Sequence, residues 1–573
     1  MVILRLGLFG ISTLGFFELI RKASNDRVSI YFLPSLTIAI QVTILFLAGL
    51  LNLLPETAKG LYFIGFAAVI YSFYKAKGIS FVKIYINTGY AVLLILLSIL
   101  AIYLKGKIFS HYDNFSHWAI VVRRMLETNR YPNFEDTLIQ FQAYPLGSAT
   151  FIYFFAKFVS HSESVQMLAQ SYMMLAAVLP LYYFAKKNQL AISVVFVSFV
   201  NFIFLYNTKI TELLVDTLLP LAGVCGLLFT YVHCKECRKI MLFFSAFYMV
   251  QLIQIKNSGI FFVVFIAILI ISFSWKRKEY LHGIICIVLP FISLLLWQKH
   301  FEYVFASAAS SRHAMTVESF RSVFGEKHGG DITQICFAIF KYAISYKEAW
   351  IVAGICALIG ALIFFGRKEL RKTFFLAFAF SLVLYVSYQI GMLAMYLFSM
   401  PGEGAVNLAA IDRYTKTILV AILYVIMIPA VQLVSQTDAK KALTFFTTAC
   451  ISASFFVGMY ISSGTINTVI QNKTDATERN WIENAGKKYG VPMYNSYCIL
   501  IPSADSGYAS YLGKYIFQSN AVSTEVVESE ENLNNISAKY IFVYDQTNEV
   551  INAWIQKNYP EQIGNEVIVQ TAG

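Results

Sequence analysis

Apolar runs long enough to cross a membrane dominate the pattern of hydrophobic and polar positions along this 573-residue chain. A membrane-spanning helix needs about 20 mostly apolar residues. By that measure the sequence predicts fourteen spans, most of them separated by short polar loops. The predicted spans lie at 3–20, 29–53, 60–74, 85–104, 164–185, 189–206, 212–233, 239–255, 258–274, 280–298, 347–366, 373–397, 414–435 and 441–463.

The charges of the short loops orient these spans. Twenty Lys and Arg residues lie in the short loops on one side, and the positive-inside rule makes that side cytoplasmic. Both termini are then extracytoplasmic. A further span at 144–160 would invert every later loop. We therefore expect 144–160, and likewise 333–345, to be helices lying at the outer membrane surface with aromatic anchors.

Three segments lie outside the predicted spans, and the last of them differs in kind. The tail is polar, and strand patterns at 497–501, 522–527, 539–544 and 566–570 alternate with helical patterns at 475–489, 508–517 and 549–559. Such alternation predicts a small α/β domain. The expected organisation is N-terminal spans at 1–104, a first external loop with surface helices at 105–163, spans at 164–298, a second external loop at 299–346, spans at 347–463 and an extracytoplasmic α/β domain at 464–573.

Composition narrows the class of protein. Charged residues make up 14% of the chain and hydrophobic residues 58%, whereas soluble domains carry about 25% charged residues. This excludes a cytosolic enzyme, a nucleic-acid-binding domain and a disordered chain. The net charge of +12 is attributed to Lys and Arg in cytoplasmic loops rather than to nucleic-acid binding. Most of the eight cysteines lie in apolar runs, so no disulfide framework is predicted.

The first external loop contains the densest polar chemistry of the chain. Asp113 follows the fourth span closely and is expected near the membrane surface. On a helix, Asp113 and His117 would be one turn apart and would share a face. Such a pair can act as a base with its orienting partner, or as two metal ligands. The alternative is that Asp113 caps the N-terminus of a surface helix.

This loop also carries a family resemblance. The run 113–118 (DNFSHW), followed by 144–147 (YPLG), resembles the first external loop of the GT-C glycosyltransferases. These polytopic enzymes, which include protein O-mannosyltransferases and the lipid A aminoarabinose transferase, take a sugar from a polyprenyl-phosphate carrier. The resemblance implies that Asp113 is the catalytic carboxylate of the loop, with the role of a base. It also implies that Tyr144 binds substrate in a Tyr-Pro-Pro-like turn. The second proline of that turn is Leu146 here.

Acidic residues recur on the same side of the predicted membrane. Glu212 and Asp216 are one turn apart at the outer end of the seventh span, where a carboxylate normally faces protein or a water-filled cavity. The resemblance implies a second acidic catalytic residue in this loop, which would be Asp216 or Glu212. The alternative is a cap at the outer end of the helix.

Two basic residues on that side are candidate phosphate ligands. Lys256 lies in a loop of a few residues between the eighth and ninth spans, and its ammonium suits a phosphate leaving group. Arg413 opens the thirteenth span and is similar to the phosphate-binding arginine of bacterial GT-C enzymes. The alternatives are a lysine that extends to the membrane surface and an arginine paired with Asp412 or Glu403.

The second external loop adds Arg312 and His313 as candidate substrate-binding residues. The loop is rich in Ser, Gly and charged residues, which predicts a mobile segment. Such a segment can order over bound substrate. The alternative is a plain flexible loop.

These observations predict an all-α polytopic plasma-membrane protein with a small C-terminal α/β extracytoplasmic domain. The resemblance implies a glycosyltransferase that moves a hexosyl or pentosyl group from a polyprenyl-phosphate carrier to an envelope glycan, lipid or protein acceptor, with inversion. The lipid bilayer is an expected partner and nucleic acid is not. A divalent metal, Mg²⁺ or Mn²⁺, stays open as a cofactor. A lipid-linked sugar flippase or transporter, a polysaccharide polymerase or ligase and a non-catalytic scaffold are the alternatives.

Overall fold

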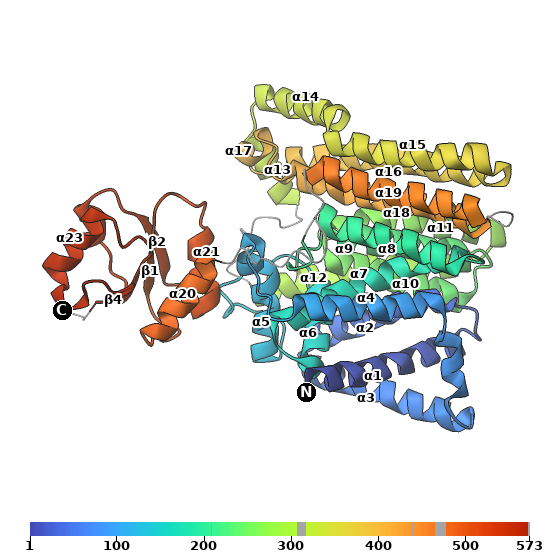
Figure 1. The fold of residues 1–573 in the computed structure, drawn as a ribbon, viewed down its shortest axis with the longest axis horizontal. Helices are drawn as coiled ribbons and strands as arrows, with labels where there is room; N and C mark the ends of the chain where they lie inside the picture. The colour runs from blue at the N-terminus through green and yellow to red at the C-terminus, as the bar shows by residue number, and fades with distance from the viewer. Residues whose placement is uncertain (208, 306–316, 437–440, 464–476, 571–573) are drawn as a thin grey trace.

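The computed structural model describes residues 1–573 apart from 208, 306–316, 437–440, 464–476 and 571–573. Long helices form a bundle, and a small α/β domain is attached at one end of it (Figure 1). In the described ranges, ten helical stretches are long and apolar enough to cross a membrane, or eleven if one bent pair counts as a span. The chain is therefore a multi-pass membrane protein with a mainly helical fold.

Each of the fourteen predicted spans coincides with a helix, but not every helix is a full span. α9 and α10 have only 16 and 17 residues, and α4 follows the short helix η2 (Ile79–Tyr85) at an angle of 84°. The count of fourteen is therefore not confirmed. The helices are α1 Val2–Ala23, α2 Leu33–Leu50, α3 Leu54–Lys75, α4 Thr88–Leu104, α7 Glu163–Val178, α8 Gln189–Tyr206, α9 Leu218–His233, α10 Lys239–Ile255, α11 Ile260–Arg277, α12 Tyr280–Val304, α15 Lys347–Gly366, α16 Arg371–Phe398, α18 Ile411–Gln436 and α19 Lys441–Ser463.

The shorter helices of the external segments include α5 (Ala119–Thr128), α6 (Gly147–Val159), α13 (Val317–Gly325), α14 (Gly329–Ser345) and α17 (Gly402–Val406). The prediction of a helix at 333–345 is confirmed by α14. The expectation that 144–160 anchors its aromatics at the membrane surface is wrong. Phe151 and Phe154 of α6 are buried, because α6 packs among α1, α2, α5 and α7. Its apolar side chains are used for packing inside the protein.

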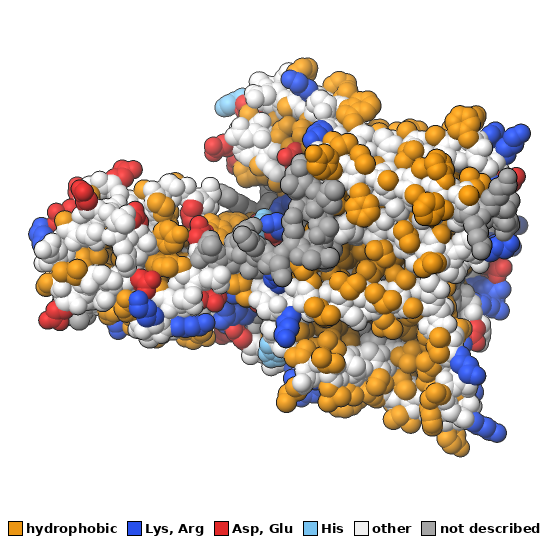
Figure 2. Space-filling model, in the orientation of Figure 1, with side chains coloured by type: hydrophobic (Ala, Val, Ile, Leu, Met, Phe, Trp, Pro, Cys, Tyr) orange, Lys and Arg blue, Asp and Glu red, His pale blue; other side chains and the backbone are white. Residues whose placement is uncertain are grey.

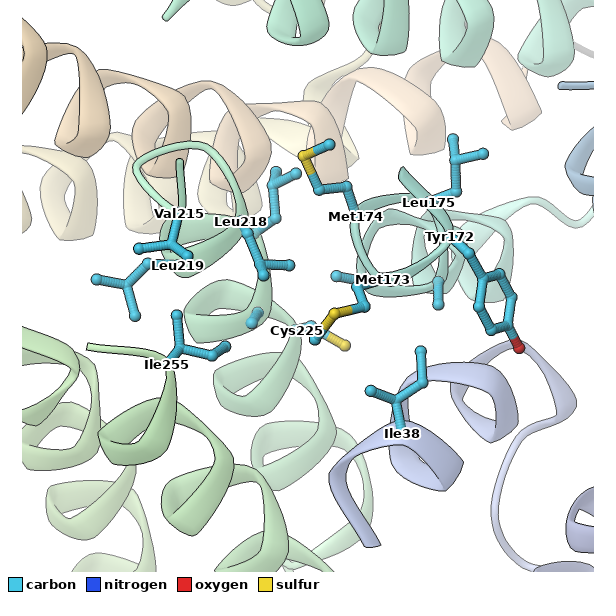
Figure 3. Packing of buried hydrophobic residues seen from close by; sticks show 14 of the residues in the cluster. Ile38, Tyr172, Met173, Met174, Leu175, Val215, Leu218, Leu219, Cys225 and Ile255 are labelled. Atoms are coloured by element: carbon cyan, nitrogen blue, oxygen red, sulfur yellow. The ribbon is translucent and has the colours of Figure 1, made fainter. Parts of the chain in front are cut away.

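The centre of the bundle is an apolar core between α2, α7, α9 and α18. α7 and α18 are the most buried of the long helices. Figure 3 shows Met173 of α7 beside Cys225 of α9, with Ile38 of α2 next to them. Unbranched methionine side chains fill irregular gaps between helices. This packing fixes the position of α9, and therefore of the loop that precedes it.

The C-terminal domain is an α/β sandwich, as its alternating pattern predicts. Its strands are β1 (Tyr497–Ile501), β2 (Val522–Val526), β3 (Tyr540–Val543) and β4 (Val567–Val569). The order is β2-β1-β3-β4, with β1 parallel to β2 and β3 and with β4 antiparallel to β3. Its helices are α20 (Thr477–Lys488), α21 (Tyr508–Phe517), α22 (Glu530–Asn534) and α23 (Glu549–Asn558). The sequence pattern predicted all of these elements except the five-residue α22.

Alternate strand residues face opposite layers of this domain. Tyr497 and Ile499 of β1 join the large core that continues into the helical bundle. Cys498 and Leu500 of the same strand pack into a separate core with Trp554 of α23. The face covered by α20 and α21 is therefore the face turned toward the bundle (Figure 1).

An ion pair fastens this domain to the first external loop. Arg479 of α20 donates to both carboxylate oxygens of Glu163 at 2.7 and 2.9 Å, and to the carbonyl of Phe109 at 2.8 Å. The hydroxyl of Tyr515 donates to the same carboxylate at 2.8 Å. A planar guanidinium that meets a carboxylate with two parallel bonds gives both energy and orientation. The domain is therefore held in one position on the loop.

Replacing Arg479 with alanine should loosen this attachment. The variant leaves Glu163 largely buried without its guanidinium, and breaking a buried pair in this way costs about 3–5 kcal/mol. We expect faster amide hydrogen exchange in α20 and α21 and unchanged exchange in α23. Lys488→Ala is the matched control, because Lys488 makes an exposed ion pair with Glu566 of little energetic value. Equal exchange in both variants would contradict the role of Arg479.

Candidate functional site

The first element of the candidate site is a turn of π-helix in the first external loop. Asp113 is its N-terminal flanking residue, and the π-turn covers Asn114–Trp118 (η3) before α5 begins. The residues expected to form an α-helix from Asp113 to His117 form this π-turn instead. Asp113 pairs with Arg413, whereas His117 is buried against aromatic rings. Single π-turns inside helices are frequent at functional sites. Here the turn leaves Asp113 at its rim and places Phe115 against Tyr515 of the C-terminal domain.

The second element is an irregular segment between α8 and α9. Glu212 and Asp216 were expected one turn apart on a helix, but α9 begins only at Leu218. Polar side chains hold the irregular backbone instead. Gln170 of α7 donates to the carbonyls of Glu212 and Leu214, each at 3.1 Å. Non-helical backbone inside a membrane protein is tolerated only where such partners satisfy it.

The same segment is tied to the π-turn. The amide of Leu213 donates to Oδ1 of Asn114 at 3.0 Å. Both Glu212 and Asp216 are buried. The two acidic segments, which lie about a hundred positions apart in the sequence, therefore form one structural unit.

Lys256 occupies the turn between α10 and α11. It follows the last residue of α10 and precedes the short 3₁₀ turn Asn257–Gly259 (η5). A Cβ on Gly259 would lie 2.1 Å from the carbonyl oxygen of Leu252, so only glycine permits this tight reversal. The turn fixes the backbone from which the lysine side chain extends.

The YPLG motif lies against this turn. A Cβ on Gly147 would lie 2.7 Å from backbone atoms of Gln254, which explains why the motif ends in glycine. Tyr144 lies in a group of aromatic rings with Trp118, Phe141 and His117. Burial raises the pKa of Tyr144 to about 12, and the nearby charge of Lys256 opposes this rise. Tyr144 is therefore a neutral hydroxyl beside the lysine.

The four charged residues form a continuous chain of ion pairs. Asp113 pairs with Nη1 of Arg413, whose Nε lies 3.5 Å from Oδ2 of Asp216. Oδ1 of Asp216 accepts from Nζ of Lys256 at 3.0 Å. The ring of Tyr414 lies beside both cations, 5.3 Å from Nζ of Lys256 and 5.6 Å from Cζ of Arg413. Four separate segments of the chain thus contribute to one cluster.

Arg413 does not pair with Asp412 or Glu403, the acidic residues near it in the sequence. Asp412 instead accepts a hydrogen bond from the hydroxyl of Tyr342, and Glu403 lies in α17. In the structure Arg413 bridges Asp113 and Asp216. The site therefore contains a guanidinium shared by two carboxylates.

The electrostatics of the cluster follow from burial opposed by pairing. Burial alone would raise the pKa of Asp216, but Lys256 and Arg413 hold it below its ordinary value. Burial alone would lower the pKa of Lys256, and Asp216 raises it above its ordinary value. Both groups are therefore charged at neutral pH, and each depends on the other for its charged state.

Burial has a larger effect on Glu212 than its charged neighbours have. Burial raises its pKa to about 7, and the charge of Lys209 only partly opposes this effect. His111 is a further neighbour that the sequence did not single out, and its Nδ1 accepts from the amide of Asp113 at 3.1 Å. Burial lowers the pKa of His111, so its ring is neutral at pH 7.

The structure thus brings together Asp113, Asp216, Lys256 and Arg413, with Glu212 and Tyr144 around them. His117 lies further into the aromatic group. Arg312 and His313 lie outside the described residues. The sequence analysis did not single out His111, Lys209 or Tyr414 as residues of the site. Tyr414 had a signal, because it follows Arg413 directly and an aromatic ring beside two cations is a recurring arrangement.

The donor set gives little support for a metal. In the part of the chain that the structure describes, no three His, Cys, Asp or Glu side chains gather as a metal-binding group. Asp113 and Asp216 share Arg413 between them rather than facing a common open point. The divalent cation that the sequence left open therefore stays a prediction.

Comparisons with known proteins add no family assignment. Neither the protein-family models, nor the curated proteins, nor the solved structures gave a match to this chain.

Replacing Glu212 with glutamine should stabilise the protein in a pH-dependent way. The raised pKa of Glu212 means that the folded state keeps a proton that the unfolded state releases above pH ~4.3. The folded state therefore loses stability as pH rises from that value toward 7, and glutamine removes the loss. We expect a gain on the order of 1–3 kcal/mol at pH 8 and a smaller gain at pH 5.

Thermal unfolding midpoints of the protein in detergent at both pH values measure this difference. Glu135→Gln serves as the control, because Glu135 is exposed and pairs with Arg130 at 2.8 Å. A shift of the same size at pH 5 and pH 8 would show that Glu212 is already ionised in the folded protein.

Proposed function

We propose that this protein is a membrane glycosyltransferase that moves a sugar from a polyprenyl-phosphate carrier to an extracytoplasmic acceptor. The observation that carries the proposal is the convergence of two carboxylates and two cations from four segments at one end of the bundle. Sugar transfer from a lipid phosphate requires a base for the acceptor hydroxyl and positive charge for the departing phosphate. The cluster supplies both kinds of group.

Asp113 is the proposed base. Its side chain is 21% exposed, whereas that of Asp216 is 4% exposed. Asp113 can therefore meet an incoming hydroxyl, and Asp216 serves to hold the two cations. In the proposed reaction the acceptor oxygen bonds to the anomeric carbon, the bond from that carbon to the phosphate oxygen breaks, and the hydroxyl proton passes to Asp113.

Arg413 and Lys256 are the proposed phosphate ligands. The chain as described has Arg413 engaged by Asp113, and a carboxylate paired in this way is a poor base. A donor phosphate that binds Arg413 competes with Asp113 for the guanidinium. We propose that donor binding in this way releases the base, so that Asp113 becomes reactive only when donor is present. Tyr414 lies beside both cations and Tyr144 lies near Lys256, so they supply a ring face and a hydroxyl.

The proposed orientation places this cluster, both termini and the C-terminal domain outside the plasma membrane. Its support is the distribution of Lys and Arg among the short loops. The sugar donor then reaches the site already attached to its carrier. The acceptor, in this proposal, is a glycan, lipid or protein of the cell envelope.

Asp113→Asn should abolish most of the transfer. Purified protein is given a panel of polyprenyl-phosphate sugars with envelope extract, and release of free polyprenyl phosphate is measured. Loss of a general base typically lowers the rate by about 10²–10⁴-fold, so we expect a fall in that range. Glu135→Gln, a neutralised carboxylate in the same loop, should keep wild-type activity. Unchanged thermal unfolding of the Asp113 variant excludes a folding defect.

A flippase or transporter gives a different result in the same preparation. Wild-type protein would release no polyprenyl phosphate from any donor, while labelled lipid would move between the leaflets of proteoliposomes. That pair of results would contradict the transferase and leave Asp113 as the partner of Arg413 only.

The product should carry the inverted anomeric configuration. A single in-line displacement with Asp113 as base attacks the anomeric carbon from the face opposite the phosphate, so the configuration changes once. The coupling constant of the anomeric proton in the purified product measures this. A product that keeps the configuration of the donor would require a covalent sugar–enzyme intermediate and would overturn the role given to Asp113.

A further inference from the structure

A hollow lies between α15 and α16, in the half of the bundle away from the charged cluster. It has a volume of about 600 Å³. Small residues of α15 form one wall, namely Ala353, Ala357, Gly360 and Ala361, and phenylalanines of α16 form the other, namely Phe374, Phe375 and Phe378. A stripe of small side chains facing large rings leaves a groove between two helices. The groove is apolar along its length.

A second hollow lies on the other flank of α15. It has a volume of about 330 Å³ and is lined by Leu433 of α18 and by Leu443 and Phe446 of α19. The two hollows share Ala361 and Phe365. The end of α15 is therefore bordered by apolar space on two sides, where Phe365 is 86% exposed.

One arginine stands at the end of the larger groove. Arg371 is a lining residue, and its guanidinium lies 4.2 Å from the centre of the Phe364 ring. Its Nε donates to the carbonyl of Phe364 at 3.1 Å. These contacts hold the charged group at the mouth of the groove. Among the described residues, no ion pair to an acidic side chain is recorded for Arg371.

Further positive charge surrounds this mouth. The loop from α15 to α16 carries Arg367, which lines the second hollow, and the exposed Lys368. The exposed Lys372 follows Arg371 in the first turn of α16. Glu369 is the one acid of the segment 367–372. Figure 2 shows blue side chains along the edge of the bundle opposite the C-terminal domain, beside orange side chains on the helices. An apolar groove with cations at one end matches a molecule with an apolar chain and an anionic head.

We infer that this groove binds a phospholipid with an anionic headgroup, its acyl chain between α15 and α16 and its phosphate on Arg371. The occupant is a phospholipid rather than the sugar carrier, because Arg371 begins α16 at the end of the helix that lies away from Arg413. The positive-inside orientation puts the mouth at the cytoplasmic leaflet, where basic clusters beside spans attract anionic lipids. A basic pocket between helices on that side is a recurrent lipid site.

Native mass spectrometry of the full chain in detergent tests the inference. Phosphatidylglycerol and phosphatidylcholine of equal chain length are added separately, and the fraction of protein carrying lipid is measured. One basic side chain near an anionic surface changes affinity by about fivefold. We expect wild type to favour phosphatidylglycerol by at least that factor and Arg371→Gln to lose most of the preference. Arg277→Gln, at the end of α11 and away from both hollows, should keep it.

A second variant tests the groove itself. Ala361→Trp fills the space that both hollows share while leaving every cation in place, and Ala361 is exposed in the groove rather than packed in the core. Binding of both phospholipids should fall, with unchanged thermal unfolding. Equal binding of the two lipids by wild type, an unchanged preference in Arg371→Gln, or displacement of bound phosphatidylglycerol by polyprenyl phosphate would each overturn the assignment.

Discussion

The arrangement of the charged end of this protein depends on one buried carboxylate. Asp216 is 3% exposed and contacts Lys256 and Arg413 with its two oxygens. An ion taken out of water costs several kcal/mol unless opposite charges and hydrogen bonds offset the loss. The carboxylate therefore requires both cations, and both cations require it. Without Asp216, two positive charges would face each other beside the ring of Tyr414.

This constraint explains why the backbone before α9 is irregular rather than helical. The sequence predicted a span from residue 212, but α9 begins only at Leu218 and the backbone before it is irregular. The irregular backbone places Asp216 between α10 and α18. Gln170 and Asn114 hydrogen-bond to backbone carbonyl and amide groups that would be paired with each other in a helix. Irregular backbone of this kind is tolerated in a membrane protein where protein groups surround it. The cost of the break is offset by the charge pairs it makes possible.

The sequence predicted the local helices and strands well, but it predicted the long-range ion pairs poorly. The tail alternates strand and helix patterns whose periods differ, so β1 and α21 were predicted with the bounds they have. Arg413, by contrast, lies 300 positions from its partner Asp113, and nearest-neighbour reasoning offered Asp412 instead. The burial of α6 was missed for a related reason. An aromatic, apolar helix has the same composition whether it faces lipid or protein, and only the packing of α2 and α7 decides between them.

The C-terminal domain and the charged cluster both contact the π-turn of the first external loop. Phe115 in the π-turn packs against Tyr515 and Tyr508 of the domain, while Asp113 at the edge of that turn pairs with Arg413. A π-turn is rare and requires surrounding contacts to hold it. The Arg479–Glu163 pair holds the chain just before the turn, because Glu163 also accepts from the amide of Phe109 at 2.6 Å. The position of Asp113 relative to Arg413 is thus fixed partly by a domain whose described residues contribute no charged side chain to the cluster.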